Sequence, residues 1–326
     1  MEKIDYDRIR KNLNFAPNNI LNLNVLFFNI ILFLLAVFFF LHDSFLGYCV
    51  SQVLFALHFN HAYLLVHETS HYSFFSNRRM NIIVGHMASI FAFLPFFSRQ
   101  FEHSGHHRWA GSFEEPSTKR ALRTFCILND HVKKLLNYCW RFWIPIFAIN
   151  EHIQLWKLSF KKCVKKDAFQ KRRLFSAIFL LIIYASILCL PNAFGILVDM
   201  LPALLIYLIL IEFLNLPHHV DSLIEDSSKP FAFWQQERYS KSFKPLPLGL
   251  NRILLLNFNY HVGHHFYPNL PWHELGHLQK KLVKLDSKFG DLEDELTWNL
   301  KNRRQPVEVI FKKYFEFQNN LNLKPI

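Results

Sequence analysis

The histidines are the residues whose types and spacing most clearly indicate chemistry in this chain. The pattern His-x-x-His-His occurs twice and a His-x-x-x-His pattern occurs once. On a helix, side chains three and four positions apart lie on one face, so the imidazoles of each cluster can point at the same spot. With 18 histidines in 326 residues, a random chain would contain His-x-x-His-His only ~0.05 times. The clusters predict a metal site with more than one ion, formed by His67, His71, His103, His106, His107, His261, His264 and His265.

The number of these ligands says more about the metal than their type. Imidazole binds iron, zinc, copper and nickel, so it does not name the ion. A zinc site closes with three or four protein ligands, and eight imidazoles overfill one such site. Two ions, each with a vacant coordination position, can be bound by all eight ligands, and this arrangement suits activation of O2. All-nitrogen ligation in a membrane protein indicates a di-iron centre.

Apolar runs predict where the chain crosses a membrane. The hydrophobic fraction is 51%, and the apolar residues are grouped in blocks that match the ~30 Å hydrocarbon core. A further apolar segment, 81–97, is interrupted by polar residues and proline. If it crossed the bilayer, the first two histidine clusters would lie on opposite sides, so a re-entrant or interfacial segment is expected. The predicted spans are 21–41, 45–66, 174–190 and 196–214.

Charge indicates the orientation. The net charge is +12, yet nothing in the chain resembles a nucleic-acid module. The segment 108–173 is strongly basic, whereas the turns 42–44 and 191–195 contain no lysine or arginine. Because basic loops stay in the cytoplasm, both termini and every histidine cluster are expected there. The expected fold is all-α: a four-helix transmembrane bundle with a cytoplasmic helical cap from 98–173 and 215–326, in one domain over 1–326.

The order of the clusters resembles that of a known family. His-x-x-x-His, His-x-x-His-His, a spaced extra histidine and a second His-x-x-His-His followed by Pro268–Pro271 are similar to the membrane fatty acid desaturase superfamily over about residues 20–285. That group includes acyl-lipid and sphingolipid desaturases, with carotenoid ketolases and alkane hydroxylases as relatives. The resemblance implies a di-iron centre on the eight histidines and a ninth ligand near the last span. His218 fits the ketolase-like Leu-Pro-His pattern and is preferred; His219 fits the Asn-x-x-x-His pattern of acyl-CoA members.

The implied activity is a lipid desaturase that uses O2 and two external electrons to introduce a C=C bond. Glu68 stands where many acyl desaturases carry aspartate, which leaves the substrate open, and a carotenoid or lipid hydroxylase or ketolase is the alternative. The tail has no His-Pro-Gly-Gly haem signature, so a separate ferredoxin or cytochrome is expected as electron donor. The basic loop 157–173 could receive an acidic donor or contact anionic lipid. The expected location is a bacterial inner membrane or the endoplasmic reticulum.

A zinc protease is the remote alternative. His67–His71 and His273–His277 both read His-Glu-x-x-His, in which the glutamate is the general base of a metalloprotease. This interpretation leaves both His-x-x-His-His clusters unexplained. Glu212 is a further candidate, because its spacing from Asn215 and His218 would let it orient a metal ligand.

Overall fold

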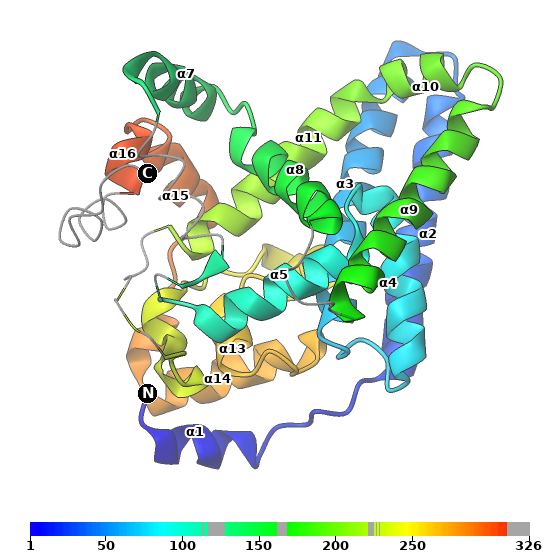
Figure 1. Cartoon of the computed structure of the whole chain (residues 1–326). Helices are drawn as coiled ribbons and strands as arrows, with labels where there is room; N and C mark the ends of the chain where they lie inside the picture. Colours follow the sequence, from blue (N-terminus) through cyan, green and yellow to red (C-terminus); the bar gives the residue numbers. More distant parts are fainter. Residues whose placement is uncertain are drawn as a thin grey trace.

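The computed structural model of the chain describes residues 1–112, 114–116, 128–161, 168–220, 225, 227 and 229–311. In these residues the backbone forms α-helices and short 3-10 helices, and its only strand-like pairs are two isolated bridges (Figure 1). The prediction of an all-α fold is confirmed.

Helix α3 (Phe45–Ser70) is the central element of the fold. It forms a hairpin with α2 (Asn19–Phe40), as the predicted spans 21–41 and 45–66 require. The side chains of Asn18 and Ser44 cap the two helices by accepting hydrogen bonds from backbone N–H groups of the first turn. Most of α3 is buried, because α2, α4, α5 and α11 pack around it. The far face of α2 leaves apolar side chains exposed, as a helix in contact with lipid does.

Helices α4 (Arg78–Ala92) and α5 (Phe96–Trp109) meet at an angle of 100°. Phe93 ends α4 in the left-handed conformation with φ 56°, and Pro95 precedes α5. The ring of Phe96 packs on Gly85, where a Cβ atom would overlap it. The 15 residues of α4 extend only about 22 Å, less than the ~30 Å core. The bend fits either a broken span or the re-entrant segment predicted for 81–97, which stays a prediction.

The second half of the membrane region is divided differently from the prediction. Helices α9 (Ala168–Leu188) and α10 (Ala193–Asp199) form a second bent pair, at 106°, and α11 begins anew at Leu201 and ends at Asn215. The predicted continuous span 196–214 is therefore wrong at its start, since Pro202 lies where a new helix begins. Three helices (α2, α3 and Leu201–His218) are long and apolar enough to cross a membrane, or up to five if each bent pair is one span. The four-span count stays a prediction.

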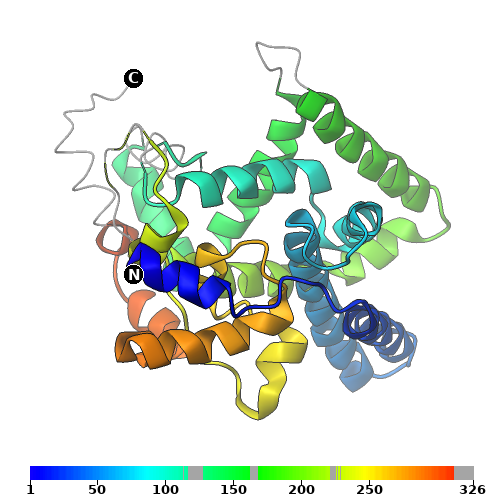
Figure 2. The same cartoon turned by 90° about the horizontal axis from the view of Figure 1, so that it is seen from below.

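Helices α1, α13 and α14 lie on the side where α3 ends (Figures 1 and 2). Helix α1 packs there against an apolar cluster to which α14 contributes, and Tyr6 of α1 stacks on Tyr267 at 4.5 Å and donates a hydrogen bond to the carbonyl of Phe266. Residues 162–167 of the basic loop and the tail 312–326 are outside the described part of the chain.

The bounds of the remaining helices are α1 Lys3–Arg10, α7 Asp130–Arg141, α8 Ile146–Phe160, η1 Leu216–His218, η2 Phe233–Tyr239, η3 Pro247–Gly249, α12 Leu250–Leu254, α13 His261–Phe266, η4 Trp272–Glu274, α14 Leu275–Leu285, η5 Ser287–Gly290, α15 Glu295–Asn302 and α16 Val307–Ile310.

A buried ion pair attaches the C-terminal helices to α11. Arg303 lies 3.0 Å from Glu212 and is sandwiched between the rings of Trp140 and Trp143, at 4.1 and 3.9 Å. Glu212 also accepts a hydrogen bond from the backbone N–H of Phe147 in α8. The partner of Glu212 is therefore an arginine, and the expectation that it orients a histidine at the metal site is wrong.

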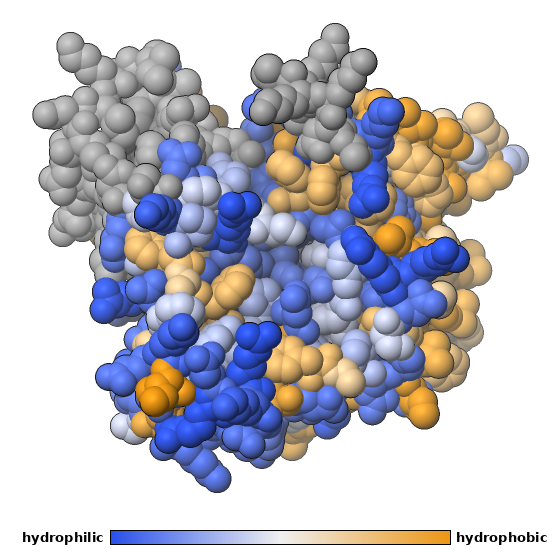
Figure 3. All heavy atoms as spheres, turned by 60° about the horizontal axis from the view of Figure 1, so that its bottom comes forward, coloured by the Kyte–Doolittle hydropathy of each residue, from blue (hydrophilic) through white to orange (hydrophobic). Residues whose placement is uncertain are grey.

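Apolar side chains gather on the flank of the molecule formed by the long helices, and hydrophilic ones cover much of the opposite flank (Figure 3). Exposed apolar residues of α2, α9 and α11 contribute to the first surface. A continuous apolar flank of this kind is expected where lipid is the solvent.

Candidate metal centre

Nine histidines form two adjacent groups, each of which could hold a metal ion. Within each group the candidate ligand atoms all lie within 4.8 Å of one another. The first group consists of His67, His71, His103, His107 and His264, and the second of His106, His219, His261 and His265.

The two His-x-x-His-His motifs are divided between the groups in opposite ways. On α5, His103 and His107 belong to the first group and His106 to the second. On α13, His264 belongs to the first group, while its two neighbours in the motif belong to the second. Adjacent helical residues point about 100° apart, so the last two imidazoles of one motif cannot serve one ion equally. The expectation that each motif points at a single spot is corrected: α5 and α13 each contribute to both groups.

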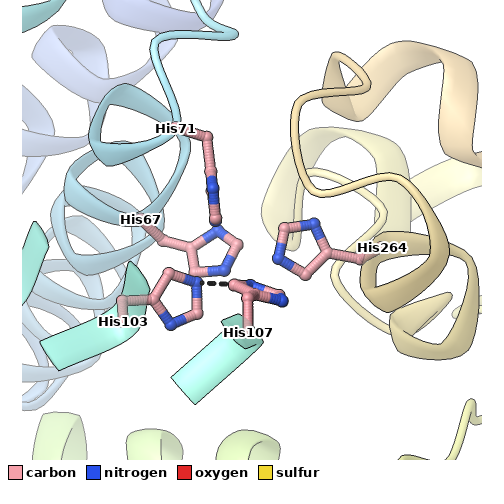
Figure 4. Close-up of side chains that lie close together, drawn as sticks. All are labelled: His67, His71, His103, His107 and His264. Atoms are coloured by element: carbon pink, nitrogen blue, oxygen red, sulfur yellow. Dashed lines mark hydrogen bonds between the residues drawn. The ribbon is translucent and has the colours of Figure 1, made fainter. Parts of the chain in front are cut away.

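Three helices bring the first group together, as Figure 4 shows. His67 and His71 lie one turn apart at the end of α3, and His103 and His107 one turn apart on α5, with their Nε2 atoms 3.1 Å apart. His264 faces them from α13. The ring centres of His67 and His264 are 4.6 Å apart. Residues separated by almost 200 positions thus meet, because α5 bends back to the end of α3 and α13 lies opposite both helices.

The second group is held by hydrogen bonds on its outer side. His106 donates from Nδ1 to a carboxylate oxygen of Glu115 at 3.3 Å, and His265 from Nδ1 to Oε1 of Gln236 at 3.0 Å. His219 donates from Nδ1 to the backbone carbonyl of Tyr239 at 3.2 Å. An Nδ1–H that is engaged in this way leaves the Nε2 lone pair of the neutral ring pointing inward.

These tautomers make the arrangement fit a cation. The inward Nε2 atoms approach one another closely: His219 to His261 at 2.8 Å, His265 to His261 at 3.2 Å and His106 to His265 at 3.3 Å. An ion about 2.0–2.1 Å from each nitrogen would leave its ligands ~3.0–3.4 Å apart. Lone pairs that face each other at this distance repel unless a cation lies between them.

The first group gives the same indication through unpaired atoms. Buried Nε2 atoms without a hydrogen-bond partner occur on His67, His71 and His264. Buried polar atoms are normally satisfied, so three such nitrogens at one point indicate that another atom satisfies them when it is bound. On this ground the residues fit two metal ions.

Burial also keeps four of these rings, which lie beyond the spans, in the form that binds metal. Desolvation is the main cause of a lowered pKa in each case, and the nearby imidazoles lower it further. A neutral imidazole has a free lone pair, whereas a protonated one has none. The histidines beyond the spans whose pKa is held well below its usual value in this way are His219, His261, His264 and His265.

His218 and His219 occupy different positions at the edge of the second group. His219, and not the preferred His218, is the member that the structure places in this group. The ring of His218 stacks on that of His261 at 4.4 Å, and its buried Nε2 lies 3.8 Å from Glu295 without a hydrogen bond. Its Nδ1 donates to the backbone carbonyl of Lys241 at 2.7 Å.

Sequence reasoning did not find the outer partners Gln236 and Glu115. Gln236 is fully buried and also donates from Nε2 to the backbone carbonyl of His107 at 2.8 Å, so it contacts ligands of both groups. A lone glutamine in a 3-10 helix, 29 positions from its partner, carries no spacing signal. Glu115 is nine positions after His106 and is also unmarked by any motif.

The second His-Glu-x-x-His motif contributes to neither group. His273 accepts a hydrogen bond from the backbone N–H of Asn18 at 3.3 Å and lies 3.7 Å from Glu274. Among the residues that the structure describes, His273 and His277 are not part of any cluster that could hold a metal. Glu68, of the first motif, is buried and lies beside the Nδ1 of His67 at 3.1 Å, which is the position of a ligand-orienting group.

Fold and site together define a class: a helical membrane protein with a histidine-rich centre that could hold two metal ions. The chain belongs to the fatty acid desaturase family, because the sequence pattern described as "Fatty acid desaturase" matches residues 43–294, more than three quarters of the chain. The match confirms the resemblance drawn from the histidine clusters. A comparison with curated proteins found no match. Family membership implies an oxidoreductase of the desaturase or hydroxylase type with a lipid substrate.

Proposed function

We propose that the chain is a membrane di-iron desaturase that introduces a C=C bond into a lipid acyl chain. The observation that supports this most directly is the pair of adjacent histidine groups that share α5 and α13. The nine histidines would hold two iron ions, and the ions when bound would supply O2 activation. A purely hydrolytic metal site needs only three protein ligands and a water.

The contribution of this chain's residues is to hold ligands and exclude water. Glu115, Gln236 and the Tyr239 carbonyl fix the rings of the second group in one tautomer, so no reorganisation is needed when metal binds. Phe258 contacts the rings of His67 and His261, at 5.1 and 4.9 Å, and covers the centre with an apolar surface. A dry site protects a reactive oxidant from side reactions.

The reaction outcome depends on how the substrate carbon is held relative to the metal ions. A desaturase removes two hydrogens and leaves a C=C bond. A hydroxylase or ketolase inserts oxygen at the same kind of centre, and this remains the second candidate. The apolar helices and the family favour a lipid acyl chain. A separate ferredoxin or cytochrome would supply the two electrons, with residues 1–326 acting as one unit whose termini and histidines face the cytoplasm.

Lipid analysis tests the proposal. The full chain is expressed in a host that lacks the gene, and extracted lipids are compared by mass spectrometry with those from a His264→Ala variant. A loss of two hydrogens in acyl chains, absent in the variant, is expected. Gain of oxygen would identify the hydroxylase alternative instead. Metal analysis of the purified chain provides the second readout: one zinc and no iron would contradict the proposal and favour the protease.

A further inference from the structure

One apolar loop on the side of the histidines is left exposed by the part of the chain that the structure describes. Pro245 to Leu254 leads from the cap into η3 and α12, just before the third histidine cluster. Leu248 at its tip is 96% exposed. Exposed large apolar side chains of this loop are Leu246, Leu248, Leu250 and Ile253.

The shape of the loop presents these side chains outward. Leu248 adopts the left-handed conformation with φ 56°, and Gly249 follows with φ 73°. A leucine with positive φ is unusual, since its Cβ crowds the backbone. In water, this conformation would expose a large apolar side chain with no gain from burial. The conformation is instead expected where the solvent around the tip is itself apolar.

A hydrogen bond fixes the loop beside a transmembrane helix. The backbone carbonyl of Ile253 bonds to Nε2 of His61 at 3.2 Å. His61 is six positions before His67 on α3, which places this contact about 9 Å along the helix from the metal centre, toward the membrane interior. The His61 ring contacts Phe28 of α2 at 5.5 Å, and the neighbouring Phe27 is exposed on the lipid-facing side. The loop is thus attached to the α2–α3 hairpin, whose outer face is apolar.

The direction of the loop agrees with a position beside the long helices. In the view of Figure 2 the loop, in yellow, projects sideways from the molecule next to the blue α2–α3 hairpin. Its backbone also suits a partly apolar environment, because Pro245 and Pro247 carry no N–H that would need a partner. The exposed Arg252 can extend its charged end to the headgroups while its stem stays apolar.

We propose that the loop Pro245–Leu254 is inserted into the bilayer, with its leucines among the acyl chains of the leaflet nearest the histidine centre. It anchors the segment that bears the third histidine cluster. Asn251 links the two, since its side-chain amide donates to the side chains of Asn257 at 2.7 Å and Asn259 at 3.3 Å. The anchor therefore fixes the approach to α13 relative to the membrane. It depends on the membrane location of the chain and is independent of which reaction the centre performs.

The unmodified full chain allows a direct test. The chain is placed in nanodiscs of phosphatidylcholine that carries a photoreactive diazirine in one acyl chain, and lipid adducts are mapped by peptide mass spectrometry. Residues 245–253 are expected to be labelled to an extent comparable with α2. Helix α15 is the matched control, because Leu296 and Leu300 are exposed by 52% and 48% in the cap. Labelling of 245–253 no stronger than that of α15 would overturn the proposal.

A spin label separates lipid from a second copy of the chain. With the signal of the unsubstituted chain subtracted, a nitroxide on Leu248→Cys is expected to be relaxed by O2 but protected from a water-soluble nickel chelate, and one on Leu296→Cys to show the reverse. Access of nickel to Leu248→Cys, or dipolar broadening between two labels, would show that water or another copy covers the loop and would contradict lipid insertion.

Discussion

The two histidine groups differ in what holds them. The first group is carried by α3 and α5, which pack against each other in the interior of the helical core, and only His264 reaches it from elsewhere. The second group takes three of its four members from the short α13 and the turn after α11, and outer hydrogen bonds to Glu115, Gln236 and Tyr239 position its rings. Packing preorganises one half of the centre, whereas local hydrogen bonds preorganise the other.

This difference predicts where the centre is most easily broken. A ligand on a long packed helix keeps its position when one contact is lost, since many apolar contacts remain. A ligand on a turn depends on few contacts, so one substitution can move it. The second group should therefore be the more sensitive to changes outside the ligands themselves.

The largest effect is expected from the choice between adjacent histidines. His219→Ala should lose iron from the second group and abolish product, because the Nε2 of His219 faces that of His261 at 2.8 Å. His218→Ala is the matched control and should retain both ions, since His218 belongs to neither group. Iron per chain and lipid products are the measurements. Full iron in His219→Ala together with loss in His218→Ala would restore the preference drawn from the sequence.

The same pair shows how far sequence reasoning reaches. Eight of the nine grouped histidines could be predicted, because helical spacing marks them without any tertiary knowledge. The position of the ring after α11 could not, since Pro217 interrupts the helix and residues Leu216–His218 form a 3-10 turn. One residue of difference in such a turn redirects a side chain by roughly 120°. The start of α11 and the partner of Glu212 also depend on tertiary contacts that no spacing reveals.

Metal removal should separate the two halves. With free metal a thousandfold above its Kd, bound ions stabilise the folded state by about 4 kcal/mol. Chelation of iron should therefore increase amide hydrogen exchange most in residues 216–220 and 259–266, and least in α3, which packing protects. Hydrogen exchange with mass spectrometry on the chain in detergent measures both. An equal increase in the two regions would contradict the comparison.

The buried pair of Arg303 and Glu212 gives a change that affects stability away from the ligands. Arg303→Met leaves the Glu212 carboxylate buried without its partner, which should cost about 3–5 kcal/mol of unfolding free energy. The double variant Arg303→Met, Glu212→Gln should recover part of this loss, because no charge remains unpaired. Thermal unfolding and iron content are the readouts. Loss of iron without loss of stability would mean that Glu212 acts on the metal centre after all.

The smallest predicted effect tests whether hydrogen bonds position the second group. Gln236→Leu removes the acceptor of His265 Nδ1–H and the donor to the His107 carbonyl, while it keeps a similar volume in a fully buried position. Loss of a partner of this kind typically lowers metal affinity by about 10–100-fold. Gln236→Glu is the informative partner variant, because a carboxylate still accepts from His265 but cannot donate to His107. If the bond to His265 is what matters, the glutamate variant keeps its affinity for iron and the leucine variant does not. An equal loss of iron affinity in both variants would assign the effect to the hydrogen bond with the His107 carbonyl, and so to α5. An unchanged affinity in both variants would show that packing alone positions the second group, as it does the first.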